Sequence, residues 1–186
     1  LGPDNEPTFS DDGYAGWTAA YNTRGTVREK IFLGLSGERI ITKGGYAIAQ
    51  YAYDARGRLI ETAYFGTDRR RILNKDGIAI ARSVHDARGN AVRTTYFDTN
   101  GRLTQDNSGA AGWTAKHDAV GRILEKTFID ENDRPKSTTS GYATVRSTYY
   151  ARGRLIGEAF LDARGRLTTL PGHEFVRVLS TYDVHG

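Results

Sequence analysis

The sequence contains no cysteine, no methionine, only four prolines and no long run of apolar residues. Without cysteine there is no disulfide framework, no thiol catalysis and no cysteine-ligated metal. No apolar segment approaches the ~18 residues that a membrane-spanning helix needs, so we expect no membrane span. The absence of methionine indicates that the sequence begins as a processed or excised segment, which removal of a signal peptide or excision from a longer array would produce.

Charge is also modest. The net charge is +4 and the isoelectric point about 9.3, and acids and arginines interleave along the chain, as in Asp54/Arg56 and Asp86/Arg88. Nucleic-acid surfaces gather Lys and Arg on one face instead, so we expect no nucleic-acid partner. The apolar fraction, 38%, is below the roughly 45–50% of typical globular chains. This composition suits a thin, strip-like core.

What the sequence has in abundance is glycine at regular spacing. Two series recur every 32 residues, one at Gly25, Gly57, Gly89, Gly121 and Gly153 and the other at Gly13, Gly45, Gly77, Gly109 and Gly141. Such a period indicates an internal repeat array. We predict one β-repeat domain over 13–186, with repeats at 13–44, 45–76, 77–108, 109–140 and 141–172 and a partial repeat at 173–186. Residues 1–12, with two prolines and four acids, are expected to be a disordered leader or linker.

Each repeat reads as a β-hairpin. In repeat two, runs rich in Tyr, Ile and Ala at 46–53 and 59–65 flank Asp54-Ala55-Arg56-Gly57. The Asp side chain can accept hydrogen bonds from backbone N–H groups ahead of it, and the Gly supplies the left-handed residue that ends a type I turn with a bulge. A second turn of the same chemistry follows in most repeats. Gly66–Arg69 lacks the final glycine and is expected to differ in shape, and the polar segment after it is expected to be a short edge strand or a loop.

Apolar residues recur in matching columns of the repeats. One second-strand column holds Phe32, Tyr64, Tyr96, Phe128 and Phe160, and stacked repeats would bury such columns as a continuous strip. No stretch shows the apolar spacing of a helix. The predicted fold is therefore all-β, an elongated or curved antiparallel β-hairpin repeat array. A parallel β-solenoid, with the glycines at its corners, is the alternative.

The motif Tyr53-Asp54-Ala55-Arg56-Gly57-Arg58-Leu59, echoed at 160–167, resembles the YD repeats of bacterial Rhs-type and related secreted proteins. The pattern runs through residues 13–186. The resemblance implies hairpins in a long coiling β-sheet, a bacterial origin and a location that is secreted, periplasmic or on the cell surface. It implies structural, encapsulating or adhesive roles rather than catalysis, so no catalytic residue is carried over.

Candidate binding residues are aromatic. Trp17 and Trp113 share one column, where solvent-facing rings could stack on sugars; the alternative is that both rings fold over neighbouring backbone as part of the core. Tyr46 and Tyr142 share another column, three residues earlier in the repeat. Because side chains alternate along a strand, the two sets are expected on opposite faces, and one platform would need a bulge.

Other polar columns are weaker candidates. His85 and His117 replace Tyr in a ladder column, where a packed ring is the simpler interpretation and a His–His metal site would need help from Asp. Glu29, Glu61 and Glu125 could mimic a glycosidase carboxylate pair, but evenly spaced acids are typical of a solvated face paired with Lys and Arg. The last column is a row of arginines along the turns, Arg24, Arg56, Arg88 and Arg152. Phosphate binding by this row is possible but not favoured.

The leading hypothesis is a non-enzymatic bacterial repeat module that binds another protein or scaffolds a neighbouring domain. The alternative is a carbohydrate- or cell-wall-binding module that uses Trp17, Trp113, Tyr46 and Tyr142. We predict no catalytic residue, no metal and no cofactor.

Overall fold

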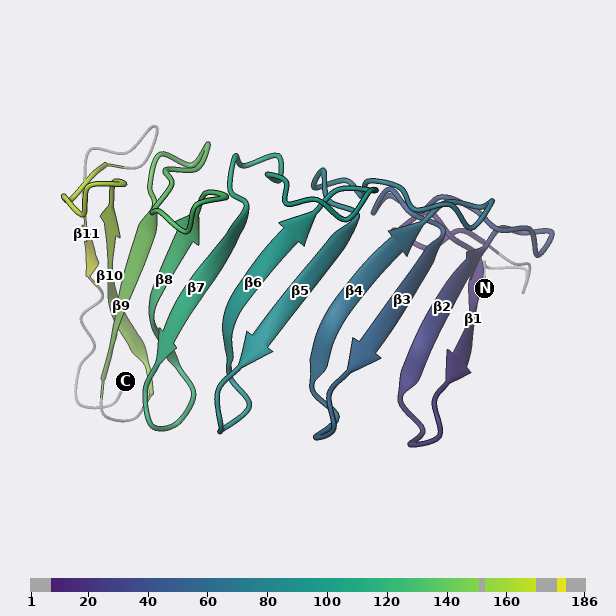
Figure 1. The fold of residues 1–186 in the computed structure, drawn as a ribbon, viewed down its shortest axis with the longest axis horizontal. Helices are drawn as coiled ribbons and strands as arrows, with labels where there is room; N and C mark the ends of the chain where they lie inside the picture. Colours follow the sequence, from purple (N-terminus) through teal and green to yellow (C-terminus); the bar gives the residue numbers. More distant parts are fainter. Residues whose placement is uncertain (1–7, 151–152, 170–176, 180–186) are drawn as a thin grey trace. The chain divides into compact units, whose positions relative to one another are not determined.

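The computed structural model describes residues 8–150, 153–169 and 177–179. Every regular element in these residues is a β-strand, and no helix forms among them (Figure 1). The strands are β1 (Gly16–Tyr21), β2 (Val27–Leu33), β3 (Ile48–Tyr53), β4 (Leu59–Phe65), β5 (Ile80–His85), β6 (Ala91–Phe97), β7 (Gly112–His117), β8 (Ile123–Ile129), β9 (Thr144–Tyr149), β10 (Leu155–Leu161) and β11 (Arg177–Leu179). The all-β prediction is confirmed.

The chain divides into two compact units. The first comprises residues 1–83 and 96–104, and the second comprises residues 84–95 and 105–186, so β5 and β6 contribute residues to both. In each unit the strands follow their order in the sequence and pair antiparallel with their neighbours. Antiparallel neighbours joined by tight turns confirm the hairpin array, and the parallel solenoid is not formed.

The hairpin turns form as their sequence predicts. Asp54 Oδ1 accepts the N–H groups of Arg56 and Arg58, both at 2.9 Å, and Gly57 adopts a φ of 81°. The register shifts between Ala52 and Tyr53, which is the bulge that a type I turn followed by a left-handed glycine requires. Equivalent shifts follow Ala20 and Lys116. The turn chemistry thus sets the register of each hairpin.

The turn without a final glycine, Gly66–Arg69, was expected to differ in shape, and this prediction is wrong. Arg69 adopts the glycine-like φ of 64°, and its N–H donates to Gly66 O at 3.2 Å, as Gly101 N–H donates to Asp98 O at 3.1 Å. The Arg69 guanidinium also binds both carboxylate oxygens of Glu29 at 2.9 Å. A charge-assisted bidentate contact of this kind offsets part of the cost of a left-handed residue that has a side chain.

A second left-handed residue that is not glycine follows the same rule. Asp133 has a φ of 63° and pairs with Arg93, which again lies 40 residues earlier in the sequence. The signs of the charges are reversed relative to Glu29 and Arg69. In both compact units, then, a side chain at this turn position links the turn to a strand of the preceding repeat.

The core is thin and rich in alanine. Ile48 and Ile80 are the largest fully buried side chains among the described residues. In the first unit Ala63, Ala79 and Ile80 form a buried cluster, with Phe65 and Phe97 packed against it. Small side chains let the connecting segments approach the strands closely, which fits the low apolar fraction. In the predicted column Phe32 and Phe160 are buried, and Tyr64, Tyr96 and Phe128 are half-buried.

Connecting segments stack from repeat to repeat through their backbone. Lys43 N–H donates to Asp12 O, and Lys75 N–H to Gly44 O, both at 2.8 Å; in the second unit Thr139 N–H donates to Ser108 O at 2.9 Å. Residues 10–13 form the first of these stacked turns, with Gly13 N–H bonded to Ser10 O at 2.9 Å. The rest of each connecting segment is a loop with one isolated bridge, such as Phe65 with Arg71.

The last described strand is displaced by one residue from the 32-residue period. In β10 and β11 Gly157 pairs with Leu179, whereas the period of the Glu29–Gln50 pair would place Val178 there. A one-residue insertion in the sequence between these two strands accounts for the displacement. Of the leader predicted at 1–12, residues 1–7 lie outside the described residues, as does most of the partial sixth repeat, whereas residues 10–12 belong to an ordered turn.

Candidate functional site

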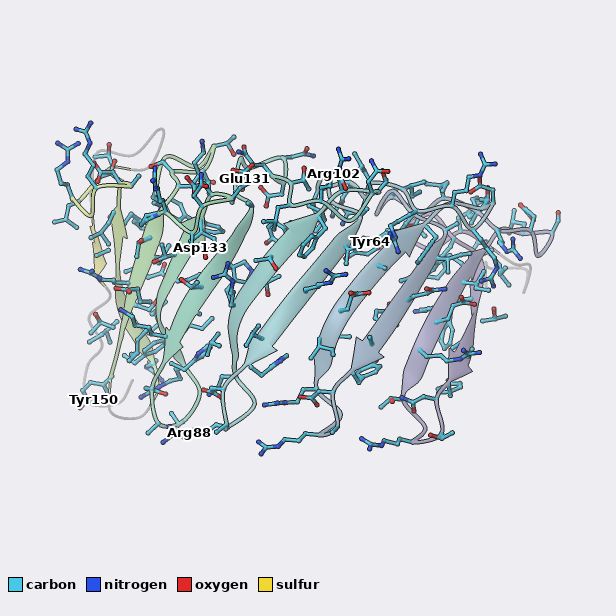
Figure 2. All side chains as sticks on the ribbon, viewed as in Figure 1. Tyr64, Arg88, Arg102, Glu131, Asp133 and Tyr150 are labelled. Atoms are coloured by element: carbon cyan, nitrogen blue, oxygen red, sulfur yellow. The ribbon has the colours of Figure 1, made fainter. Side chains whose placement is uncertain are left out.

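An aromatic ladder runs across the first compact unit. The rings of Tyr14 and Phe32 are 4.9 Å apart, those of Phe32 and Tyr46 are 5.7 Å apart, and those of Tyr46 and Tyr64 are 4.7 Å apart. The ring planes are tilted or edge-on, as aromatic pairs prefer. Figure 2 labels Tyr64, which lies toward the end of β4 that enters the connecting segment. The ladder therefore lies close to the stacked connecting turns.

A lysine joins Trp17 to this ladder. Trp17 is opposite Phe32 in the β1–β2 register, and Lys30 Nζ lies 4.4 Å from the centroid of the Trp17 ring and 5.0 Å from that of Phe32. Because Phe32 also contacts Tyr46, Trp17 and Tyr46 lie on the same side of the sheet. The expectation of opposite faces is wrong, since Tyr46 precedes β3 and strand alternation does not reach it.

The second unit repeats this cluster. Lys126 Nζ lies 4.8 Å from the Trp113 ring centroid and 5.1 Å from that of Phe128, and Tyr142 packs against Phe128 at 6.0 Å. Burial lowers the pKa of Lys126, while Asp106 raises it to a smaller extent. All four predicted aromatic residues thus belong to two matching clusters, with one tryptophan and one tyrosine in each.

The lysines were missed by sequence reasoning, although the sequence holds a signal for them. The repeats with tryptophan, one and four, are also the two with lysine in the column of Lys30 and Lys126. The lysine position has chemical consequences. An ammonium group over the tryptophan ring is attracted to it by the ring's π-electrons, so a sugar that stacks on that ring face must first displace the ammonium group.

The two tryptophan strands differ in their surroundings. Trp113 lies in β7, whose outer edge is paired with β6 through Arg93–Thr114, Thr94–Trp113 and Thr95–Gly112. Trp17 lies in β1, which pairs with β2 and with no other strand of the described chain. Trp17 is 50% exposed. The same Gly-Trp-Thr-Ala sequence is therefore enclosed in one unit and open along one edge in the other.

The space around the glycine of this sequence differs between the two strands. A Cβ on Gly112 would lie 2.1 Å from the carbonyl oxygen of Thr94 in β6, whereas a Cβ on Gly16 would meet nothing within 4 Å. At Gly112 the missing side chain is what lets the β6 backbone approach so closely. Gly16 preserves the same space beside β1.

The histidines pack in place of tyrosine. In that column the Tyr53 hydroxyl donates to Val27 O at 2.9 Å, while the Nδ1 atoms of His85 and His117 are buried and have no hydrogen-bond partner within the described part of the chain. Residues 8–150, 153–169 and 177–179 hold no group of three or more side chains suited to a metal ion. The packed-ring interpretation is the one that the geometry supports.

The glutamate column is paired, as the solvated-face interpretation predicts. Glu61 binds Arg82 at 2.7 Å, and Glu125 binds both Lys116 and Arg146 at 2.7 Å. The hydrogen bond from Arg69 holds the pKa of Glu29 below its usual value, and that from Lys116, followed by that from Arg146, does the same for Glu125. A general acid of a glycosidase needs a raised pKa instead.

Two arginines of the turn row bind carbonyl groups of the next repeat. Arg24 Nη1 donates to Ala55 O at 2.6 Å in the first unit, and Arg88 Nη1 donates to Asp118 O at 3.5 Å in the second. Figure 2 shows Arg88 at the tip of its hairpin. These guanidinium groups link neighbouring turns, which argues against a phosphate-binding row.

A groove of about 340 Å³ lies over the aromatic ladder of the first unit. Its lining includes the ladder rings and three lysines, Lys30 from β2, Lys43 from the connecting turn before β3 and Lys75 from the turn before β5. Asp12 and Asp76 also border it. The positions three repeats after Lys43 and Lys75, which is the spacing from Lys30 to Lys126, are Thr139 and Pro171 in the sequence, so the matching ladder lacks two of the three lysines.

No helix of the described residues has both the length and the apolar character to cross a membrane.

No protein-family model matches the chain, and no curated protein matches it. Among solved structures, a chain of the Photorhabdus luminescens Tc holotoxin pore carrying a TccC3 mutation aligns with 82% of this chain at 15% identity and a TM-score of 0.40. A chain of a TcdB2–TccC3–Cdc42 structure aligns with 86% at 15% identity and a TM-score of 0.38. This chain spans 9% and 8% of those chains. Likenesses this loose imply nothing about function, and the YD-repeat resemblance stays a prediction.

Proposed function

We propose that this chain is a non-enzymatic repeat module in which the edge of β1 that faces away from β2 binds an extended protein segment. The observation that carries the proposal is the contrast between Gly16-Trp17-Thr18 and Gly112-Trp113-Thr114. In β7 these residues receive the neighbouring strand β6. In β1 the same residues have no strand beside them within the described chain.

The backbone of β1 is oriented for such pairing. Phe32 N–H donates to Ala47 O, toward β3, so Phe32 does not exchange hydrogen bonds with Trp17, its cross-strand partner in β1. Hydrogen-bonded and non-hydrogen-bonded pairs alternate in an antiparallel ladder. The N–H and C=O groups of Trp17 therefore point away from β2. A docking strand would form its hydrogen bonds with these groups.

The edge of β1 also lacks the features that usually prevent strand addition. Gly16-Trp17-Thr18-Ala19-Ala20-Tyr21 contains neither charge nor proline, the two commonest means of protecting an edge. Trp17 and Tyr21 are 50% and 56% exposed. An uncharged edge with half-exposed aromatic side chains offers both backbone hydrogen bonds and apolar contact.

The best guide to the occupant is β6. It presents Arg93, Thr94 and Thr95 to β7, which are residues compatible with strand formation and include a threonine carbonyl that fits over glycine. We expect β1 to prefer a partner strand with β-branched residues at these places. A location outside the cytoplasm remains a prediction of the YD-repeat resemblance.

The test uses Trp17 as the only tryptophan, in a Trp113→Phe background. A peptide with the sequence of Ala91–Phe97 is titrated while tryptophan emission is recorded, and a peptide with the same residues in reverse order is the control. We expect a saturable emission change, at roughly millimolar peptide because one short strand binds weakly. Ala19→Pro should abolish the change, because Ala19 lies two residues from Trp17, its N–H faces the same edge, and proline removes that donor.

The controls separate binding from folding. The circular dichroism spectrum of Ala19→Pro should match that of its parent, because the N–H that proline removes faces away from β2 and proline is tolerated on such an edge. Equal responses to the two peptides, or an unaltered response in Ala19→Pro, would contradict docking at this edge. An emission change with peptidoglycan fragments and with neither peptide would favour the carbohydrate-binding alternative at Trp17.

A further inference from the structure

We propose that the groove over the tyrosine ladder of the first compact unit binds an acidic saccharide through its carboxylate and one ring face. The groove lies on the first unit alone and does not depend on strand addition at β1. Its volume of about 340 Å³ is at the lower end of small-ligand sites, which run from roughly 300 to 1,000 Å³. A short saccharide suits this volume better than a protein segment does.

The charge of the groove selects for an anion. Lys30, Lys43 and Lys75 reach it from three separate elements, against two carboxylates from Asp12 and Asp76. Backbone hydrogen bonds hold the lysine-bearing turns: Lys43 N–H bonds Asp12 O and Lys75 N–H bonds Gly44 O, each at 2.8 Å. The lysines therefore lie in adjacent stacked turns. Positive charges carried by adjacent turns attract a carboxylate.

The wall of the groove suits a sugar. Tyr14, Tyr46 and Tyr64 contribute ring surface and hydroxyl groups, and Thr42 and Asn74 add polar side chains. Such a mixture of aromatic surface with a few placed polar groups is typical of small-molecule sites. Burial, followed by the nearby acids, raises the pKa of Tyr46, and burial likewise raises that of Tyr64. Both hydroxyls keep their protons at neutral pH and can donate to sugar oxygens.

The second unit provides a built-in comparison. There Tyr142 packs between Phe128 and Phe160, at 6.0 Å and 5.0 Å, so an aromatic ladder is present. In the sequence, Thr139 and Pro171 occupy the two positions that match Lys43 and Lys75 of the first unit. An aromatic ladder alone serves the fold, whereas the added turn lysines are specific to the groove.

The test is titration calorimetry of the intact chain with trigalacturonate, with galactotriose as the uncharged match. We expect trigalacturonate to bind and galactotriose to bind at least tenfold more weakly. The variant Lys43→Gln/Lys75→Gln should lose at least tenfold in affinity for trigalacturonate. Lys116→Gln, which removes a charge on a side chain 76% exposed in the second unit, is the control and should bind as the parent does.

A second variant and two further ligands complete the test. Tyr46→Phe keeps the ring and removes the hydroxyl, and it should weaken trigalacturonate binding severalfold while the chain stays folded by circular dichroism. Equal affinity for inorganic phosphate or for a glutamate-rich peptide would overturn the proposal, since the groove would then recognise charge alone. Absence of trigalacturonate binding, or unchanged binding by Lys43→Gln/Lys75→Gln, would overturn it too.

Discussion

Strands β1 and β7 carry the same Gly-Trp-Thr-Ala sequence in two different settings. Both present their tryptophan to a phenylalanine of the next strand and to a lysine two residues before it. In β7 the preceding strand β6 covers the glycine and the threonine, and in β1 no described strand does so. The comparison separates the contacts that a strand makes within its own hairpin from those that the preceding repeat adds. Its own hairpin fixes the tryptophan–lysine contact, and the neighbouring repeat decides whether the strand is enclosed.

The largest effect should come from filling the space at glycine. We expect Gly112→Val to destabilise the second unit by about 3 kcal/mol, since the new Cβ would lie 2.1 Å from a backbone oxygen and overpacking of this kind costs 1–3 kcal/mol or more. Gly16→Val should change stability by less than about 0.5 kcal/mol, as is usual for open surface positions. Urea unfolding of the two variants measures the difference. Equal losses would mean that both glycines are needed by their own hairpins.

A smaller difference is expected when the tryptophans are truncated. Trp113→Ala should cost about 2–3 kcal/mol, near the range for partly enclosed large aromatics, and Trp17→Ala about 1 kcal/mol because its ring is 50% exposed. Acrylamide quenching tests the same point without unfolding. In single-tryptophan variants made with Phe, Trp17 emission should be quenched more strongly than Trp113 emission. The reverse order would show that β1 is covered in solution.

The smallest effect should appear on acidification, at the turns that follow the two strands. Burial raises the pKa of Asp118, but hydrogen bonds from Arg122 and Val120 outweigh it and hold the pKa below the ordinary 3.8. With a folded-state pKa lower than the unfolded one, this carboxylate stabilises the turn above about pH 4, and the contribution is lost as the pH falls through the folded-state pKa. The β1–β2 turn has Asn22 at this place, which does not titrate.

Amide exchange reads the two turns separately. The N–H groups of Val120 and Arg122 donate to Asp118 Oδ1, and they should lose protection relative to the intrinsic rate as the pH falls through the lowered folded-state pKa of Asp118. The N–H groups of Arg24 and Thr26 donate to Asn22 Oδ1, and the pH dependence of their exchange should follow the intrinsic rate throughout. Parallel loss in both turns would point to general acid unfolding rather than to Asp118.

Several features of the fold could be predicted because they are local. Asp54 and Gly57 form their turn within four residues, and the strands on either side of this turn can pair only as an antiparallel hairpin. The turn at Arg69 could not be predicted, since its glycine-like backbone accompanies a contact with Glu29, 40 residues away. The side of the sheet on which Tyr46 lies was missed for a related reason. Alternation applies within a strand, and Tyr46 is held by the neighbouring repeat through Phe32.

The candidate site follows the same division. Trp17, Trp113, Tyr46 and Tyr142 could be chosen from their columns, because an aromatic residue in a polar repeat is visible in the sequence. Lys43 and Lys75 could not, since their groove exists only where stacked turns from successive repeats lie beside the ladder. A repeat period reveals which residues are equivalent, and it does not reveal which side chains meet across the repeats.

By itself the sequence determined the 32-residue period, the hairpins, the bulged turns and the columns that stack, because each depends on backbone preferences of a few adjacent residues. Only the tertiary structure decided that β6 pairs along the Gly-Trp-Thr strand β7, that Arg69 and Asp133 adopt the glycine conformation, and that three lysines line a groove over a tyrosine ladder. These outcomes depend on contacts between residues far apart in the chain, where packing and charge outweigh local preference.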